Sequence, residues 1–129
     1  MNLFFAIGVI AAGGALGSVM RYLISIWFLD RLGPGFPWGT FTINVTGSFL
    51  IGVVLGMAAA RAGFSPYLRL FLATGLLGGY TTFSTFSYEG LNLFSDALTS
   101  TAILYVVASV VLGIIGCLAG ISAARSFAH

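Results

Sequence analysis

The 129-residue chain is 59% hydrophobic and only 6% charged, and its mean hydropathy is +1.08. A soluble domain carries about 25% charged residues, so this composition excludes an ordinary water-soluble protein and indicates a membrane protein. Five arginines, no lysine and three acidic residues give a net charge of +2, which is too sparse for a nucleic-acid-binding surface.

The apolar segments are long enough for four membrane crossings. A crossing helix needs about 20 residues, and we expect an all-α membrane protein with spans at about 3–29, 39–61, 67–95 and 99–125. These spans use almost the whole chain, which predicts a single transmembrane domain over residues 1–129. The first segment lacks the basic start of a secretory signal, so we interpret it as a retained helix.

The loop arginines give only a weak preference for one orientation. With four spans, the chain ends and the turn at 61–66 share one side, which carries Arg61, Arg69 and Arg125. The other side carries Arg21, Arg31 and two aspartates. Because orientation follows the arginine bias of the loops, three against two predicts a chain that inserts either way round.

Every span carries two glycines at four-residue spacing: Gly13/Gly17, Gly52/Gly56, Gly75/Gly79 and Gly116/Gly120. Small residues at this spacing let membrane helices approach closely. The pattern favours a compact helical bundle and is consistent with packing against a second copy of the chain. Cys117, the one cysteine, lies in an apolar run and is interpreted as a packed core thiol.

Polar residues form stripes on two of the spans. Thr40, Asn44 and Ser48 follow one another at four-residue intervals, hence on one face of the second span. Two interpretations stay open: hydrogen bonds between helices, or a polar lining for a solute path. Tyr105 and Ser109 repeat the spacing in the fourth span, although a tyrosine near the end of a span is also typical of an interfacial anchor.

The third span combines hydroxyl and aromatic side chains. Thr82, Thr85 and Glu89 fall on one helical face, and Phe83 and Phe86 fall on a neighbouring one. Ordinary core or lipid packing explains many phenylalanines in a chain that has 12 of them. Their alternation with hydroxyls in TTFSTFS argues for a role beyond packing.

The Gly78-Gly79 pair predicts that the third helix is broken near its middle. Each glycine lowers helix stability by about 1 kcal/mol relative to alanine, and the threonines and serine that follow compete for backbone partners. Lipid cannot satisfy the polar groups that a break exposes, so breaks persist only inside protein or beside water and ions. The stretch therefore predicts an ion site, because freed carbonyls hold cations and helix N-termini attract anions. A kinked helix with hydroxyl back-bonding is the alternative.

Three stretches resemble one known family. GGYTTFSTFSYE (78–89) is similar to the signature GGxTTFSTFSxE of the Fluc/CrcB fluoride channels. PWGTFTINVTG (37–47) and GGALGSVMR (13–21) resemble the family's second-span and first-span patterns. The resemblance covers essentially the whole chain and implies a multi-pass channel of the bacterial cytoplasmic (inner) membrane that exports fluoride passively and relieves fluoride toxicity. It also implies an antiparallel, dual-topology homodimer in membrane lipid, with a structural sodium ion at its centre.

The resemblance implies roles for individual residues as well. The family's sodium ligands, backbone carbonyls at the third-span break, correspond to Gly78 and Thr81. Its fluoride pathway corresponds to these positions: Arg21, Asn44, Thr82, Phe83, Ser84, Thr85, Phe86, Glu89, Tyr105 and Ser109. Gly113 departs from the family, because several members carry a serine there, and this puts in doubt a polar contact at that level of the fourth span.

Two other function classes fit the sequence less well. A small multidrug-type, proton-coupled transporter also has four spans but needs an acidic residue inside a span. Here the first span has no acid, and Glu89 lies late in the third. An enzyme needs a nucleophile with a base, or a metal-binding set. The only histidine is the terminal His129, which we interpret as part of a tail rather than a ligand, so we expect no enzymatic activity.

Overall fold

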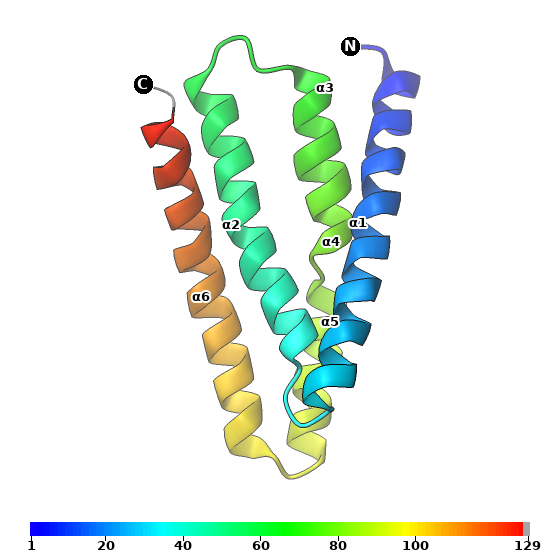
Figure 1. Ribbon diagram of the computed structural model, residues 1–129, viewed down its shortest axis with the longest axis vertical. Coiled ribbons are helices and arrows are strands. Elements are labelled where there is room, and N and C mark those ends of the chain that lie inside the picture. The colour runs from blue at the N-terminus through cyan, green and yellow to red at the C-terminus, as the bar shows by residue number, and fades with distance from the viewer. Residues whose placement is uncertain (128–129) are drawn as a thin grey trace.

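The computed structural model describes residues 1–127, and this part of the chain is helical with short connections (Figure 1). Four rods run up and down side by side. They are α1 (Leu3–Leu32), α2 (Trp38–Ala60), a segmented third rod, and α6 (Thr99–Ser126). The predicted all-α fold is confirmed, and His129 lies outside the described residues.

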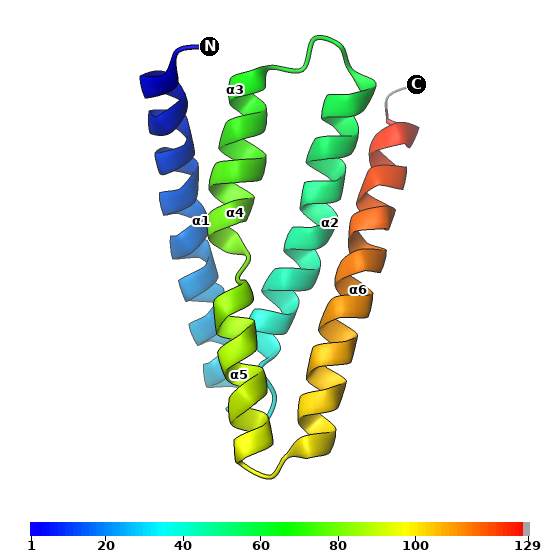
Figure 2. The same ribbon diagram turned by 180° about the vertical axis from the view of Figure 1, so that it is seen from behind.

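The third rod consists of four successive pieces. These are α3 (Pro66–Arg69), the π-helix η1 (Leu70–Leu77), α4 (Gly78–Tyr80) and α5 (Phe83–Ser95). Together they run the length of the bundle, and the chain narrows to a thin extended connection between α4 and α5 (Figures 1 and 2). The predicted break in the third helix is therefore confirmed. The break lies slightly later in the chain than the predicted Gly78-Gly79 pair.

Three helices in the described chain are each long and apolar enough to cross a membrane, namely α1, α2 and α6. The third rod is divided into pieces too short to meet that criterion singly, so the fourth crossing stays a prediction. Most large apolar side chains point outward; Phe4, for example, is 85% exposed. An apolar exterior of this kind suits lipid rather than water, and the chain is a multi-pass membrane protein.

Glycines set the spacing between rods. On α1, Gly13 and Gly17 lie against the third rod, where an added Cβ at Gly17 would collide with the carbonyl of Leu76. On the other side of the bundle, α2 packs on α6, and a Cβ at Gly120 would collide with the carbonyl of Phe49. The predicted close-packed bundle is therefore confirmed. Cys117 is half-buried on α6 beside Gly52 of α2.

The π-helix directly before α4 was not predicted from the sequence. Its wider turn ends at Gly78, whose backbone N–H donates to the carbonyls of both Ala73 and Gly75. Such turns are rare and occur mostly as short insertions in helices, frequently at functional sites. Here the irregular segment leads directly into the break.

The turn between α5 and α6 forces one alanine into a left-handed conformation. The N–H of Leu98 donates to the Leu93 carbonyl and the N–H of Ala97 to the Phe94 carbonyl, at 2.9 and 3.2 Å. This pattern is a Schellman motif, which favours glycine at the position where Ala97 has φ 60°. Ala97 is the one non-glycine residue with positive φ in the described chain.

We therefore expect Ala97→Gly to stabilise the protein, because glycine removes the steric cost of the left-handed conformation. The gain should be about 0.5–1 kcal/mol, seen as a higher thermal unfolding midpoint in detergent. Ala62→Gly, in a loop where the alanine has no positive φ, is the control and should not stabilise. Equal shifts in the two variants would contradict this account of the turn.

Candidate functional site

The break in the third rod lies at Thr81 and Thr82, three residues after the predicted Gly78-Gly79 pair. Gly78 is helical, with φ −64° and ψ −37°, whereas Thr81 (φ −79°, ψ 156°) and Thr82 (φ −148°, ψ 122°) are extended. Adjacent β-branched residues favour an extended backbone. Gly79 serves a different need, since an added Cβ there would lie 2.5 Å from the Gly14 carbonyl of α1.

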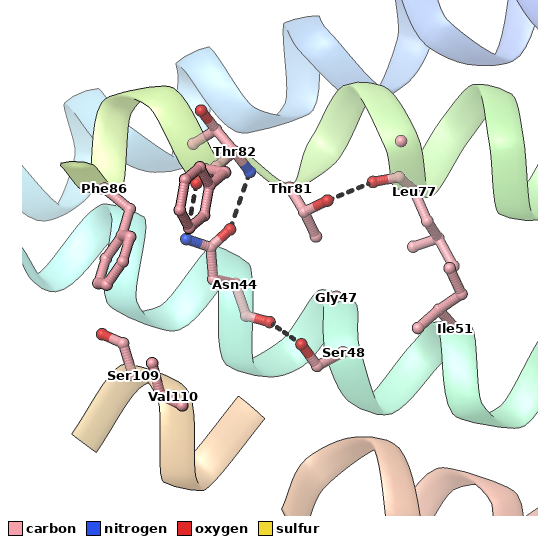
Figure 3. Close-up of a pocket in the computed structure, with 12 residues that line it drawn as sticks. Asn44, Gly47, Ser48, Ile51, Leu77, Thr81, Thr82, Phe86, Ser109 and Val110 are labelled. Carbon is pink, nitrogen blue, oxygen red and sulfur yellow. Dashed lines mark hydrogen bonds between the residues drawn. The ribbon is translucent and has the colours of Figure 1, made fainter. Parts of the chain in front are cut away.

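The Asn44 side chain spans the break with two hydrogen bonds (Figure 3). The backbone N–H of Thr82 donates to its Oδ1 at 2.8 Å, and its Nδ2 donates to the Thr82 carbonyl at 3.0 Å. The amide thus replaces the helical partners that Thr82 lacks. Asn44 does form an interhelical link, one of the two interpretations left open by the sequence, and it also lines a cavity.

Other bonds satisfy the helix ends on either side of the break. The Thr81 hydroxyl donates back to the Leu77 carbonyl at 2.9 Å, so the hydroxyl back-bonding considered as an alternative occurs beside the break without closing it. Thr82 caps α5 by accepting from the N–H of Thr85 at 3.2 Å. Arg21 of α1 donates from Nε to the Gly79 carbonyl at 3.1 Å.

Some carbonyls at the break remain open. Within residues 1–127, no hydrogen bond of the chain reaches the carbonyl oxygens of Gly78, Tyr80 or Thr81. Gly78 is exposed on the surface of the rod. Two of these three positions, Gly78 and Thr81, are the ones that the family resemblance identified as cation ligands.

A cavity of about 310 Å³ lies between α2, the break, α5 and α6. Its polar lining comes from Asn44, Ser48, Thr81, Thr82 and Ser109. Phe83 and Phe86 also line it, with apolar residues of α2, η1 and α6, and no charged residue takes part. Figure 3 shows the Asn44 amide at the break, with Ser48 a turn away on the same helix and Ser109 facing them from α6. Asn44 and Ser48 of the second span and Ser109 of the fourth span therefore meet at one cavity.

The Ser109 hydroxyl is a buried polar group of this cavity that lacks a hydrogen-bond partner among the described residues. Its side chain is buried, and its Oγ has no hydrogen-bond partner in the described part of the chain. A buried polar group without a partner costs about 1–3 kcal/mol. One turn further along α6, a Cβ at Gly113 would lie 3.5 Å from the Ser48 hydroxyl. Ser48 therefore supplies a polar group at the level where Gly113 has none.

The two phenylalanines have different surroundings. Their ring centroids are 5.8 Å apart, with the planes inclined by 47°. Phe86 also packs against Tyr105, at 5.3 Å between centroids, so it has a packing role within the bundle. Phe83 is 80% exposed, and packing inside this chain does not account for it.

Glu89, Tyr105 and Thr40 form a separate hydrogen-bonded set of side chains beside the cavity. Thr40 and Tyr105 donate their hydroxyls to the two carboxylate oxygens of Glu89, at 2.9 and 2.7 Å. Tyr105 is fully buried, so its interpretation as an interfacial anchor is wrong. Glu89 also lines a second cavity of about 350 Å³ near loop 33–37, together with Asn92 and Asp96.

The predicted site residues thus fall into three places. Asn44, Thr82, Phe83, Phe86 and Ser109 line the first cavity; Glu89 and Tyr105 lie beside it; Arg21 lies behind the break. Thr85 is bonded to Thr82 and Ser84 is exposed. The candidate set lacked Thr40 and Ser48, although their spacing from Asn44 was the signal that could have included them.

The two bonds of Asn44 predict a large effect of its removal. Asn44→Leu leaves the N–H and carbonyl of Thr82 without partners, which should cost about 2–4 kcal/mol of unfolding free energy. Ser48→Ala is the matched control, because the Ser48 hydroxyl bonds only to the Asn44 carbonyl of its own helix, at 2.7 Å. Thermal unfolding in detergent measures both, and similar small losses would show that Asn44 does not brace the break.

Comparison with known proteins identifies the family. The family model described as CrcB-like protein, Camphor Resistance (CrcB), matches residues 8–121. A protein of Rhizobium meliloti named "Fluoride-specific ion channel FluC" is 50% identical over 117 residues, which cover 91% of this chain and 94% of the relative. Proteins with the same name from Agrobacterium fabrum (45% identical; 93% and 96% covered) and Nitrobacter winogradskyi (51%; 90% and 92%) are also similar. The chain therefore belongs to the CrcB family.

Proposed function

We propose that this protein is a channel that lets fluoride leave the cell passively across the bacterial cytoplasmic membrane, which relieves fluoride toxicity. The observation that carries the proposal is the uncharged cavity at the helix break, which Asn44, Thr82 and Ser109 line, and beside which the buried Ser109 hydroxyl has no hydrogen-bond partner within residues 1–127. The similar proteins named as fluoride-specific channels give the choice of ion.

The chemistry of the cavity suits an anion that must pass quickly. The Ser109 hydroxyl and the Asn44 amide hydrogen that does not bond the Thr82 carbonyl replace part of the water around the ion. The electropositive edges of the Phe83 and Phe86 rings attract it without a full charge. Conduction requires binding that is weak enough for the ion to leave, so a lining without arginine or lysine favours passage over trapping.

The neighbouring residues extend the path on either side. Glu89 and Tyr105, with Thr40, form a hydrogen-bonded set next to the second cavity. Ser84 and Thr85 provide hydroxyls close to Thr82. Arg21, held on the Gly79 carbonyl, places positive charge behind the break and raises the local concentration of anions.

A structural sodium ion fits the open carbonyls of the break. Sodium takes oxygen ligands, and within residues 1–127 no group of three histidine, cysteine or acidic side chains could hold a metal instead. The carbonyls of Gly78 and Thr81 accept no hydrogen bond from the described residues 1–127, and Gly78 is exposed. One copy offers too few ligands, so we propose that a second, antiparallel copy supplies the rest and covers this surface.

Purified protein in liposomes loaded with potassium fluoride should release fluoride when potassium is allowed to follow. With potassium chloride inside, release should be far slower. A fluoride electrode and a chloride electrode measure the two rates. Absence of fluoride release, or equal release of both anions, would contradict the proposed function.

Phe83→Ile offers a clean test of the ring edges, because Phe83 is exposed and its loss should not destabilise the chain. We expect fluoride flux to fall about tenfold, equivalent to roughly 1.4 kcal/mol. Phe94→Ile, an exposed phenylalanine near the end of α5 and outside the cavity, is the control. If both variants conduct like the unmodified protein, Phe83 does not belong to the path.

A further inference from the structure

The two ends of the bundle carry different charge. The end with the chain termini and loop 61–65 holds three exposed arginines: Arg61, Arg69 and Arg125. All three acidic residues of the chain lie in the opposite half, at positions 30, 89 and 96. No acidic side chain of this protein therefore neutralises the arginine end.

A third cavity of about 360 Å³ lies at this end. It is formed where the end of α2, loop 61–65, α3 and η1 come together. Arg69 is its one charged side chain, Thr74 supplies a hydroxyl, and Met1, which carries the N-terminal amino group, also lines it. The remaining lining is apolar and includes Ala58, Phe64 and Leu70. The cavity therefore combines the guanidinium group of Arg69 with a mainly apolar lining.

The start of α1 contacts Tyr67 of α3 beside this cavity. The backbone N–H of Asn2 donates to the Tyr67 hydroxyl at 3.0 Å. The Phe5 ring meets the Tyr67 ring edge to face, at 4.8 Å between centroids. Met1, which precedes these contacts, lines the cavity together with Arg69. The N-terminal segment therefore holds one wall of the cavity in place.

The position of the cavity defines the chemistry of its ligand. Arginines at the ends of apolar helices lie at the level of the lipid headgroups. Phosphate is the anion of that layer, and the guanidinium fork binds phosphate through two parallel hydrogen bonds. The uncompensated charge of the arginine end favours a lipid with net negative charge over a zwitterionic one. The apolar lining accommodates the glycerol and the first part of an acyl chain.

We infer that this cavity binds an anionic phospholipid, with its phosphate on Arg69. The site is separate from the ion path and does not depend on the proposed transport function. The cavity is formed by residues of a single chain.

Thermal unfolding of the full chain in neutral detergent tests this inference. The unfolding midpoint is titrated with short-chain phosphatidylglycerol, with phosphatidylcholine of the same chain length, and with inorganic phosphate. Phosphatidylglycerol should raise the midpoint in a saturable way. Arg69→Gln should weaken its apparent affinity about fivefold, the effect of one arginine near a membrane surface. Arg31→Gln, at the opposite end where the guanidinium lies 5.3 Å from the Trp27 ring centroid, should leave the affinity unchanged.

Three outcomes would overturn the inference. The first is an equal shift with phosphatidylcholine and phosphatidylglycerol, and the second is unchanged affinity in Arg69→Gln. The third is an equally saturable shift with inorganic phosphate, which would assign the site to the free anion. Native mass spectrometry that counts bound phosphatidylglycerol on Arg69→Gln and Arg31→Gln checks the same assignment without unfolding the protein. There, fewer bound lipids on Arg69→Gln supports the lipid site, and equal numbers on the two variants argue against it.

Discussion

Two hydrogen bonds between the Asn44 amide and the backbone of Thr82 hold the break on which the rest of the site depends. In lipid, an extended segment inside a helix is tolerated only when protein, water or ions satisfy its polar groups. Asn44 bonds the backbone N–H and carbonyl of Thr82, and the Thr82 hydroxyl caps α5. The new helix begins at Phe83, so that Phe83 and Phe86 lie beside the cavity. Before the break, the Gly79 carbonyl accepts from Arg21, and the carbonyls of Gly78 and Tyr80 accept no hydrogen bond within residues 1–127.

Close packing of backbones keeps the break in position. Glycines on α1 bring this helix against the third rod, where Arg21 reaches the Gly79 carbonyl. On the α2 side, Thr46 and Tyr80 share a hydrogen bond at 3.0 Å next to Gly47, whose added Cβ would collide with Thr81. Contacts from α1 on one side and from α2 on the other therefore hold the break in position within an otherwise regular helical bundle.

Apolar length and residue spacing along one segment predicted the helices and the shared face of Asn44 and Ser48, whereas the placement of the other candidate residues at one site came from the family resemblance. Apolar length located α1, α2 and α6, and the four-residue interval placed Asn44 and Ser48 on the cavity face. Low helix propensity predicts the break at Gly78-Gly79, three residues too early, because Gly79 instead allows close contact with α1. The bonds of Glu89 come from neighbouring rods, and propensity and periodicity carried no signal for them or for the π-helix.

Hydrogen exchange at the amide of Thr82 tests whether the Asn44 side chain holds the break. In the unmodified protein this amide donates to Asn44, while the Thr81 amide donates to the Leu77 carbonyl at 3.0 Å. In Asn44→Leu, we expect exchange at Thr82 to accelerate about tenfold or more, the effect of losing one hydrogen bond, while Thr81 stays protected. Unchanged protection of Thr82 in that variant would show that Asn44 does not hold the break.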